Sequence, residues 1–385
     1  MFDFVSAGES HGPGVISIIS GVPSGFPVSL DGIDGELKRR QKGYGRGGRM
    51  AIEKDRVKII SGIRGGYTLG SPVAFLIENK DWENWAPYMN PDGNIKPGQE
   101  VTKPRPGHAD LAGGMKYGHR DLRNVLERAS ARETVARTAA GALAKIILSK
   151  FRIVFVSYVI SIGNVVIDSG DVSFSERKKN ASNSPFSTPV PDMDDNLKKI
   201  VDKAKSEGDT LGGVVEVVAA GLPPGLGGPE QWYTRLDAKL AAALMSIPAI
   251  KGVEIGDGFE LSKKFGSDAH DEIYFDDSRK FYRKTNRAGG LEGGITNGEP
   301  LVLKAAMKPI PTLMTPLHSV DIKSKKDIDA QAERSDVMAV PAASVVAEAM
   351  TAVVLAGEFL QKFGGDNFDD ISGNYKNYLD RINAY

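Results

Sequence analysis

The chain has 385 residues, of which 41% are apolar and 25% charged, ordinary values for a globular protein with a large core. Its 49 basic and 49 acidic residues balance, and the absence of cysteine excludes disulfides, thiolate zinc sites and a cysteine nucleophile. No apolar run approaches the length of a membrane span, and the N-terminus lacks the pattern of a signal peptide. We therefore expect a cytoplasmic protein that does not bind membranes.

Apolar, β-branched runs bounded by glycine predict strands at residues 14–20, 57–61, 73–78, 153–162, 213–220 and 301–306. Helical spacing predicts helices at about 131–150, 194–206, 237–247 and 341–361. Ser130 is the predicted N-cap of the first helix, and Glu133 completes a capping-box sequence. The helix at 194–206 should be exposed, whereas the last is apolar nearly all round and should be buried between layers.

These elements do not alternate regularly, which favours an α+β fold over a doubly wound parallel sheet. Long buried helices would be covered by antiparallel sheet. Residues 168–193 are rich in Ser, Asp, Lys and Pro, so we interpret them as a mobile insertion within a single domain, 1–385.

Two segments are enriched in arginine despite the neutral total. Residues 36–64 carry ten Lys/Arg against three Asp/Glu, and residues 101–140 carry eight against four. One such run usually means a solvated basic face, but two that are interleaved with glycine and histidine favour an anionic ligand. Residues 43–48 match the motif G-x-G-x-x-G, but no buried strand is predicted before them, so they do not indicate a dinucleotide-binding fold. We interpret them as a flexible loop with three candidate anion-binding residues, Arg40, Arg46 and Arg49.

His11 lies in a glycine-rich turn, residues 8–14, just before the first predicted strand. Imidazole exchanges a proton near neutral pH, and bare glycine backbone lets a ligand approach closely. The alternative is a surface turn in which Ser10 or His11 bonds only local backbone. The segment alone supports both interpretations equally.

A second histidine, His108, lies in a turn stiffened by prolines, where Asp110 could orient its ring for proton transfer. The alternative is that the two residues merely close the turn, but the glycine-rich, basic sequence that follows favours a function. We expect His119 to be structural, and His270 and His318 to lie on the surface.

Three further segments are candidate ligand sites. Arg128 to Arg132 begin a predicted helix, where free N–H groups and the helix dipole favour anions. Lys308 to Thr312 could present backbone groups to a planar ligand, although alone they are more typical of a strand-exit turn. Arg334 to Asp336 add a phosphate binder and a carboxylate. No metal-ligand spacing or Walker A motif is visible. The residues thus indicate an enzyme for a small substrate with phosphate and carboxylate groups, without identifying the reaction.

Together these segments resemble the chorismate synthases. The family's motifs occur in order from residue 8 to about 350, at residues 8–23, 105–110, 127–134, 253–258, 289–298, 308–312 and 334–336. The resemblance implies a β-α-β sandwich with long central helices between antiparallel sheets, assembled as a homotetramer.

The implied reaction is the 1,4-anti elimination of phosphate from 5-enolpyruvylshikimate 3-phosphate, which gives chorismate in the last shared step toward the aromatic amino acids. It needs reduced FMN without net redox change. An external flavin reductase would supply the reduced flavin, with NADPH at most as the reductant. The phosphates and carboxylates of these ligands would account for the many arginines.

The resemblance also implies a role for each matching residue. His11 would protonate the departing phosphate, His108 would set the protonation state of the flavin, and Asp336 would help remove the substrate's proton. The implied substrate-binding residues are Ser10, Arg49 and Arg132, with Arg40 and Arg46 binding substrate or NADPH. The implied FMN-binding residues are Arg128, Ala129, Ser130, Pro248, Ala249, Gly293, Lys308, Pro309, Ile310, Pro311, Thr312 and Arg334.

Pro248 departs from the family pattern, in which Asn or Gln is expected at this position. Because proline cannot donate a hydrogen bond, the contact that Asn or Gln would make there is lost. The sequence leaves two alternatives. A flavin- or NADPH-dependent oxidoreductase would consume NADPH in proportion to product. Nucleic-acid binding is disfavoured by the zero net charge and by the few aromatic residues among the arginines.

Overall fold

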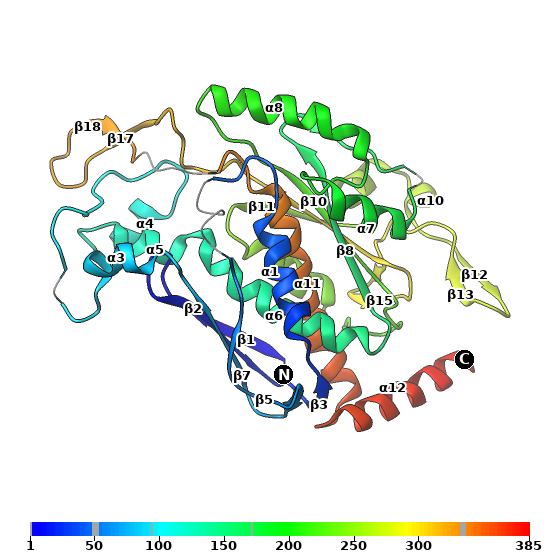
Figure 1. Cartoon of the computed structure of the whole chain (residues 1–385). Coiled ribbons are helices and arrows are strands. Elements are labelled where there is room, and N and C mark those ends of the chain that lie inside the picture. The colour runs from blue at the N-terminus through cyan, green and yellow to red at the C-terminus, as the bar shows by residue number, and fades with distance from the viewer. Residues whose placement is uncertain (1, 48–53, 94, 171, 332–335) are drawn as a thin grey trace.

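Two antiparallel sheets lie on opposite sides of a layer of long helices (Figure 1). The computed structural model describes residues 2–47, 54–93, 95–170, 172–331 and 336–385. The strands of the first sheet, in spatial order, are β1 (Asp3–Ala7), β2 (Gly14–Ser20), β7 (Val73–Glu78) and β4 (Lys58–Ser61). Those of the second are β11 (Ile250–Ile255), β16 (Leu301–Met307), β10 (Gly213–Ala220), β8 (Val154–Ile162) and β9 (Val165–Val166). All six predicted strands are confirmed.

The central layer is built on two helices, α6 (Thr134–Ser149) and α11 (Val340–Phe363). The first sheet packs on α6 and the second on α11, and the two helices pack on each other. They approach closely at Gly141, where an added Cβ would lie 2.3 Å from Cβ of Ala349. A side chain at position 141 would therefore push the two helices apart.

Because α11 is covered on all sides, its sequence is apolar nearly all round. By length and composition it could cross a membrane, which the sequence analysis did not expect of any segment. Since 94% of its most apolar window is buried inside the molecule, its apolar residues form the core between the two sheets.

A buried ion-pair group joins the central helices to α1 (Leu30–Gln41). Glu348 of α11 accepts a hydrogen bond from Arg39 Nη1 at 2.9 Å and pairs with Lys145 of α6. The C-terminal end of α1 is thereby held against α11. Removing both cations would leave the buried charge of Glu348 uncompensated.

The remaining elements surround this sandwich. A small three-stranded sheet contains β3 (Ser24–Pro27), β6 (Tyr67–Leu69) and β5 (Ile63–Arg64). The hairpins are β12 (Ile273–Asp276) with β13 (Lys280–Arg283), β14 (Leu291–Glu292) with β15 (Ile295–Thr296), and β17 (His318–Val320) with β18 (Asp327–Asp329). The other α-helices are α3 (Trp82–Met89), α4 (Asp110–Tyr117), α5 (Arg123–Ala129), α7 (Phe174–Asn183), α8 (Asp194–Ser206), α9 (Leu236–Met245), α10 (Gly266–Ala269) and α12 (Phe368–Asn383). The 3₁₀ helices are η1 (Ala131–Glu133), η2 (Pro191–Met193) and η3 (Gly258–Lys263).

The helix predicted at 131–150 is confirmed, but its first turn is η1 and the predicted capping box does not form. Ser130 Oγ accepts a hydrogen bond from the backbone N–H of Arg132 at 3.3 Å. The Glu133 carboxylate accepts instead from Arg137 Nε at 2.8 Å. A guanidinium one turn away thus replaces the backbone N–H as the partner of Glu133.

Two polar segments contain more structure than the sequence predicted. Helix α8 matches the predicted bounds, but one face buries Leu197, Val201 and Ala204, so the helix is only partly exposed. The segment 168–193 contains α7, which packs on β8. Its mobility, and the assignment of residues 1–385 to one domain, stay predictions.

Candidate active site

His11 lies in the turn between β1 and β2 and is held by Glu127 of α5. Glu127 accepts hydrogen bonds from the His11 backbone N–H at 2.8 Å (Oε2) and from ring nitrogen Nδ1 at 2.9 Å (Oε1). The backbone carbonyl of Glu127 accepts a further bond from Ser10 N–H at 3.0 Å. Gly8 permits this turn, because it has φ +120° and a Cβ there would lie 2.3 Å from the Gly14 carbonyl oxygen. His11 is thus oriented by a distant helix, which favours a site over a plain surface turn.

The Glu127 carboxylate is buried, and it is shared between His11 and Arg123. Arg123 Nη1 donates to Oε1 at 3.2 Å. Burial acts to raise the pKa of Glu127, but the hydrogen bonds and charge of His11 and the charge of Arg123 lower it below its usual value. Glu127 is therefore ionised near neutral pH and places a negative charge beside the imidazole.

Arg132 and Arg40 meet on a second buried carboxylate, Asp55. Arg132 Nη1 donates to Oδ1 at 2.6 Å, and Arg40 Nη2 donates to Oδ2 at 2.9 Å. Burial lowers the pKa of Arg40 to about 10; the charge of Asp55 opposes this, and the charges of Arg132 and Arg46 add to it. Arg40 Nε is buried with no hydrogen-bond partner among the atoms that the structure describes. The three guanidinium groups are paired with two carboxylates, Asp55 and Asp336, so the cluster has a net positive charge that suits an anion.

Asn79 connects this arginine cluster to the turn of His11. Its Oδ1 accepts from Arg132 Nε at 2.7 Å, and its Nδ2 donates to the carbonyl of Gly12 at 2.7 Å. Ser130 Oγ donates to Ser10 Oγ at 3.0 Å, which joins the same turn to the start of η1. Ser10, His11, Ser130 and Arg132 are therefore brought together, as their predicted roles require.

Asp336 lies against the glycine-rich loop that carries Arg46. Its Oδ2 is 3.1 Å from Arg46 Nη1, and its Oδ1 accepts from the backbone N–H of Gly47 at 2.5 Å. The loop and the segment before α11 are thus in contact. The other predicted arginines here, Arg49 and Arg334, lie outside the described residues.

His108 is oriented by Asp110, as the sequence predicted. Ring nitrogen Nδ1 is 2.6 Å from Asp110 Oδ1, and because a carboxylate only accepts, Nδ1 carries the proton. Arg105 clamps the other side of Asp110 through Nε at 2.8 Å and its backbone N–H at 3.2 Å. Burial acts to raise the pKa of Asp110, but the hydrogen bonds and charges of His108 and Arg105 hold it well below its usual range.

The segment 308–312 lies against this histidine turn. Arg105 Nη1 donates to Thr312 Oγ1 at 2.9 Å, and Lys308 Nζ donates to the carbonyl of Gly107. The backbone N–H of Lys308 donates to the carbonyl of Ala249 at 3.0 Å. Ala249 has φ +68°, an uncommon conformation for a residue with a side chain. Three sequence-predicted segments are therefore in contact: 105–110, 248–249 and 308–312.

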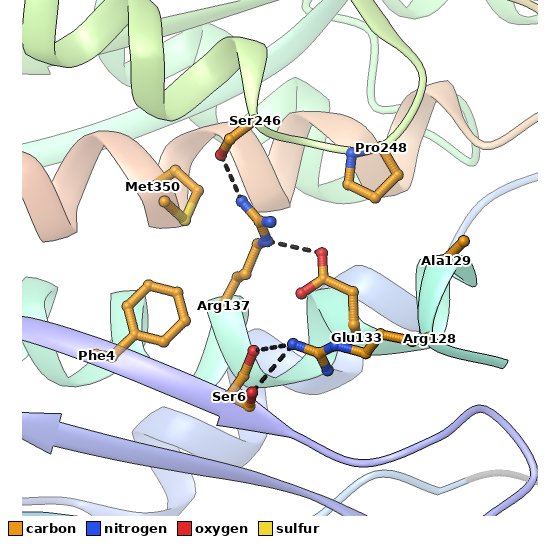
Figure 2. A pocket seen from close by; sticks show the side chains of 9 residues that line it. All are labelled: Phe4, Ser6, Arg128, Ala129, Glu133, Arg137, Ser246, Pro248 and Met350. Atoms are coloured by element: carbon orange, nitrogen blue, oxygen red, sulfur yellow. Dashed lines mark hydrogen bonds and ion pairs between the residues drawn. The ribbon is translucent and has the colours of Figure 1, made fainter. Parts of the chain in front are cut away.

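A pocket of about 440 Å³ lies between α5, α6, β1 and the segment after α9 (Figure 2). Its lining residues are Phe4, Ser6, Arg128, Ala129, Glu133, Arg137, Ser246, Pro248 and Met350. Arg128 donates to Ser6 Oγ at 2.8 Å, and Arg137 Nη1 donates to Ser246 Oγ at 2.7 Å. The pocket combines two guanidinium groups, two hydroxyls and the Glu133 carboxylate with apolar side chains. Arg137 is paired with Glu133 at 2.8 Å, so Arg128 supplies the remaining positive charge, and the lining fits a planar ligand that carries an anionic group.

Gly293 is not brought to these residues within one chain. It is exposed at the turn between β14 and β15, with φ +59° and nothing within 4 Å of an added Cβ. Figure 1 shows β15 far across the molecule from α5.

Several partners of the site escaped the sequence analysis. Glu127, Asp55, Asn79 and Arg105 hold the predicted residues in place, and Trp85 of α3 stacks on His11 with ring centroids 4.0 Å apart. The pairing of Asp110 with His108 could be predicted because the two residues are close in sequence. The other contacts join segments far apart in the chain, and no pattern of spacing predicts them.

Comparison with known proteins tests the resemblance. The family model for chorismate synthase matches residues 2–360. The chorismate synthase of Sulfurihydrogenibium sp. (strain YO3AOP1) is 55% identical over 390 residues, and that of Carboxydothermus hydrogenoformans is 54% identical over 385 residues. Both alignments cover 100% of each chain. A crystal structure of chorismate synthase, 42% identical, matches with a TM-score of 0.82 over 100% of this chain and 99% of that chain. The α+β prediction is confirmed, and this chain belongs to the chorismate synthase family.

Proposed function

We propose that the chain is a carbon–oxygen lyase that converts 5-enolpyruvylshikimate 3-phosphate to chorismate and phosphate with reduced FMN. The observation that carries the proposal is a continuous hydrogen-bonded chain. It joins His11 and its turn through Asn79 to Arg132, and through Asp55 to Arg40. A proton donor is thereby held beside a buried, positively charged cluster, the arrangement that departure of a phosphate requires.

The substrate's phosphate and two carboxylates are assigned to Ser10, Arg132, Arg40 and Arg46, with Arg49 as a further predicted contact. Arg132 and Arg40 are buried, so their attraction to an anion is less weakened by water than that of exposed arginines. Both guanidinium groups donate to Asp55, which fixes their positions, and Arg40 Nε is a buried N–H without a hydrogen-bond partner among the described atoms.

His11 gives its proton to the departing phosphate. As the carbon–oxygen bond breaks, its electron pair goes to the phosphate oxygen, which takes the proton from the imidazolium. Nδ1 faces Glu127, so Nε2 is the nitrogen that donates to the leaving group. The ionised Glu127 stabilises the charged ring before the reaction.

Reduced FMN would, when bound, accept the proton that the substrate loses in the 1,4-anti elimination. The pocket of Figure 2 fits such a group, because Arg128 and Arg137 can face a phosphate and Phe4, Met350 and Pro248 can face an aromatic ring. The residues proposed to hold it are Arg128, Ala129, Ser130, Pro248, Ala249, Lys308, Pro309, Ile310, Pro311, Thr312 and Arg334.

Two further residues would manage protons. His108, with Nδ1 fixed by Asp110, sets the protonation state of the flavin. Asp336, paired with Arg46, helps to remove the proton that the substrate loses. Gly293 would reach an FMN site only from a neighbouring copy, which the proposed homotetramer allows.

The deciding experiment is an anaerobic assay with 5-enolpyruvylshikimate 3-phosphate and dithionite-reduced FMN. We expect chorismate absorbance and phosphate release in equal amounts, with reduced flavin needed only in catalytic quantity. Absence of chorismate from folded protein would overturn the proposal. NADPH consumption in proportion to product would favour the oxidoreductase instead.

The source of reduced flavin and the assembly are tested separately. With oxidised FMN and NADPH alone we expect no turnover, and added flavin reductase should restore it. Light scattering coupled to size-exclusion chromatography should give the mass of a tetramer. A monomer that is fully active would contradict the proposed role of Gly293.

A further inference from the structure

Helix α3 is an unusual neighbour of the candidate active site, because none of its residues, all of which the structure describes, is buried. A helix of eight residues is too short to be stable alone, so tertiary contacts must hold it. Its contact with the site is Trp85, whose ring lies 4.0 Å from that of His11 with 31° between the planes.

Trp85 is itself oriented from two sides. Its indole Nε1 donates to Asp81 Oδ2 at 3.0 Å, within the first turn of α3. On the ring face, the guanidinium of Arg123 lies 4.9 Å from the ring centroid, in cation–π geometry. The position of the indole is therefore set independently of any ligand.

Arg123 joins both partners of His11, since it stacks on Trp85 and donates to Glu127. Glu127 contacts the edge of the imidazole, while Trp85 covers its face. Charged groups placed against the two rings include Glu127 and Arg123 of α5, and Asp81, which accepts from the indole nitrogen.

We propose that Trp85 is a positioning residue for His11. The carboxylate of Glu127 fixes one ring nitrogen but leaves the ring free to tilt about that hydrogen bond. The indole removes this freedom and keeps Nε2 aimed at the ligand site. It also stabilises the charged ring through a cation–π contact and excludes water from one face. This role rests on the proposed proton transfer by His11.

The stack can be tested without turnover. In a Trp82→Phe/Trp232→Phe variant, Trp85 is the sole tryptophan of the chain. A protonated imidazole quenches a stacked indole more strongly than a neutral one, so Trp85 emission should rise in one step as pH increases. His11→Gln in this background should abolish the step, and Glu127→Gln should move it to lower pH because the charged ring loses its carboxylate. A step that persists unchanged in His11→Gln would overturn the proposal.

Kinetics then separate positioning from a merely structural role. Trp85→Leu should lower kcat by roughly five- to tenfold with little change in KM. Trp85→Phe, which keeps an aromatic face, should recover most of that loss. Equal kcat in Trp85→Leu and the parent, or a change confined to KM, would refute the role. If Trp85→Leu does not fold, Trp85→Met takes its place, because methionine fills the space without an aromatic face, and an unchanged kcat in that variant would refute the role.

The two proposals can fail separately. A parent enzyme that makes no chorismate but keeps the His11-dependent fluorescence step would refute the proposed function and leave the stack intact. A parent that makes chorismate without this step would refute only the role of Trp85.

Discussion

His11 and Glu127 come from segments 116 residues apart, whereas His108 and Asp110 lie two residues apart in one turn. Each pair joins an imidazole to a buried carboxylate, but the charges around them differ. Arg105 holds Asp110 through its side chain and its backbone, while Arg123 makes one hydrogen bond to Glu127. More of the Glu127 charge is thus available to His11. The comparison suggests that His11 is arranged to carry a proton and His108 to keep a fixed orientation.

The largest effects are expected when either imidazole is removed by substitution with alanine. His11→Ala should lower turnover by roughly 10²- to 10⁴-fold in the anaerobic assay, the range for loss of a general acid. His108→Ala should also lower turnover severely, with both variants retaining the circular dichroism of the parent. If either variant is fully active with pre-reduced FMN, its assigned role is wrong.

A smaller effect should follow from neutralising the carboxylates. Hydrogen bonds to charged groups are worth about 1.5–3 kcal/mol, so Glu127→Gln should slow turnover by roughly 10- to 100-fold. Its activity should also fall at a lower pH than that of the parent, because the protonated form of His11 loses its counter-charge. Asp110→Asn is the matched control. It should lower kcat without moving this limb of the pH profile, and a shift of equal size in both variants would erase the distinction between the pairs.

The smallest effect concerns stability in acid. Glu127 and Asp110 have lowered pKa values in the folded protein, so each stabilises the fold above the unfolded pKa of about 4. That contribution is lost as the pH falls through the folded pKa. The free energy of unfolding of Glu127→Gln and Asp110→Asn should therefore depend less on pH below about 4 than that of the parent. Urea titrations at several pH values measure this, and parallel curves for parent and variants would contradict it.

Local signals in the sequence predicted much of this structure. The strands at 14–20 and 213–220 and the long buried helix at 341–361 follow from strong apolar patterns. The pairing of His108 with Asp110 follows from a two-residue spacing.

What the sequence did not reveal depends on tertiary contacts. Asp55 reaches Arg132 from a segment 77 residues away, and Trp85 reaches His11 from a short helix that has no buried residue. The capping box predicted at Ser130 does not form, because Glu133 pairs with Arg137. In each case a distant or charged partner outweighs a local preference.

The close approach of α6 and α11 at Gly141 has a consequence for the site as a whole. Helix α6 starts just after Arg132, and α11 starts just after Asp336. The helix pair therefore spaces the two halves of the ligand site, and its separation is set where one residue has no side chain. The absence of a side chain at Gly141 in the core therefore controls the distance between Arg132 and Asp336, although Gly141 is remote from both.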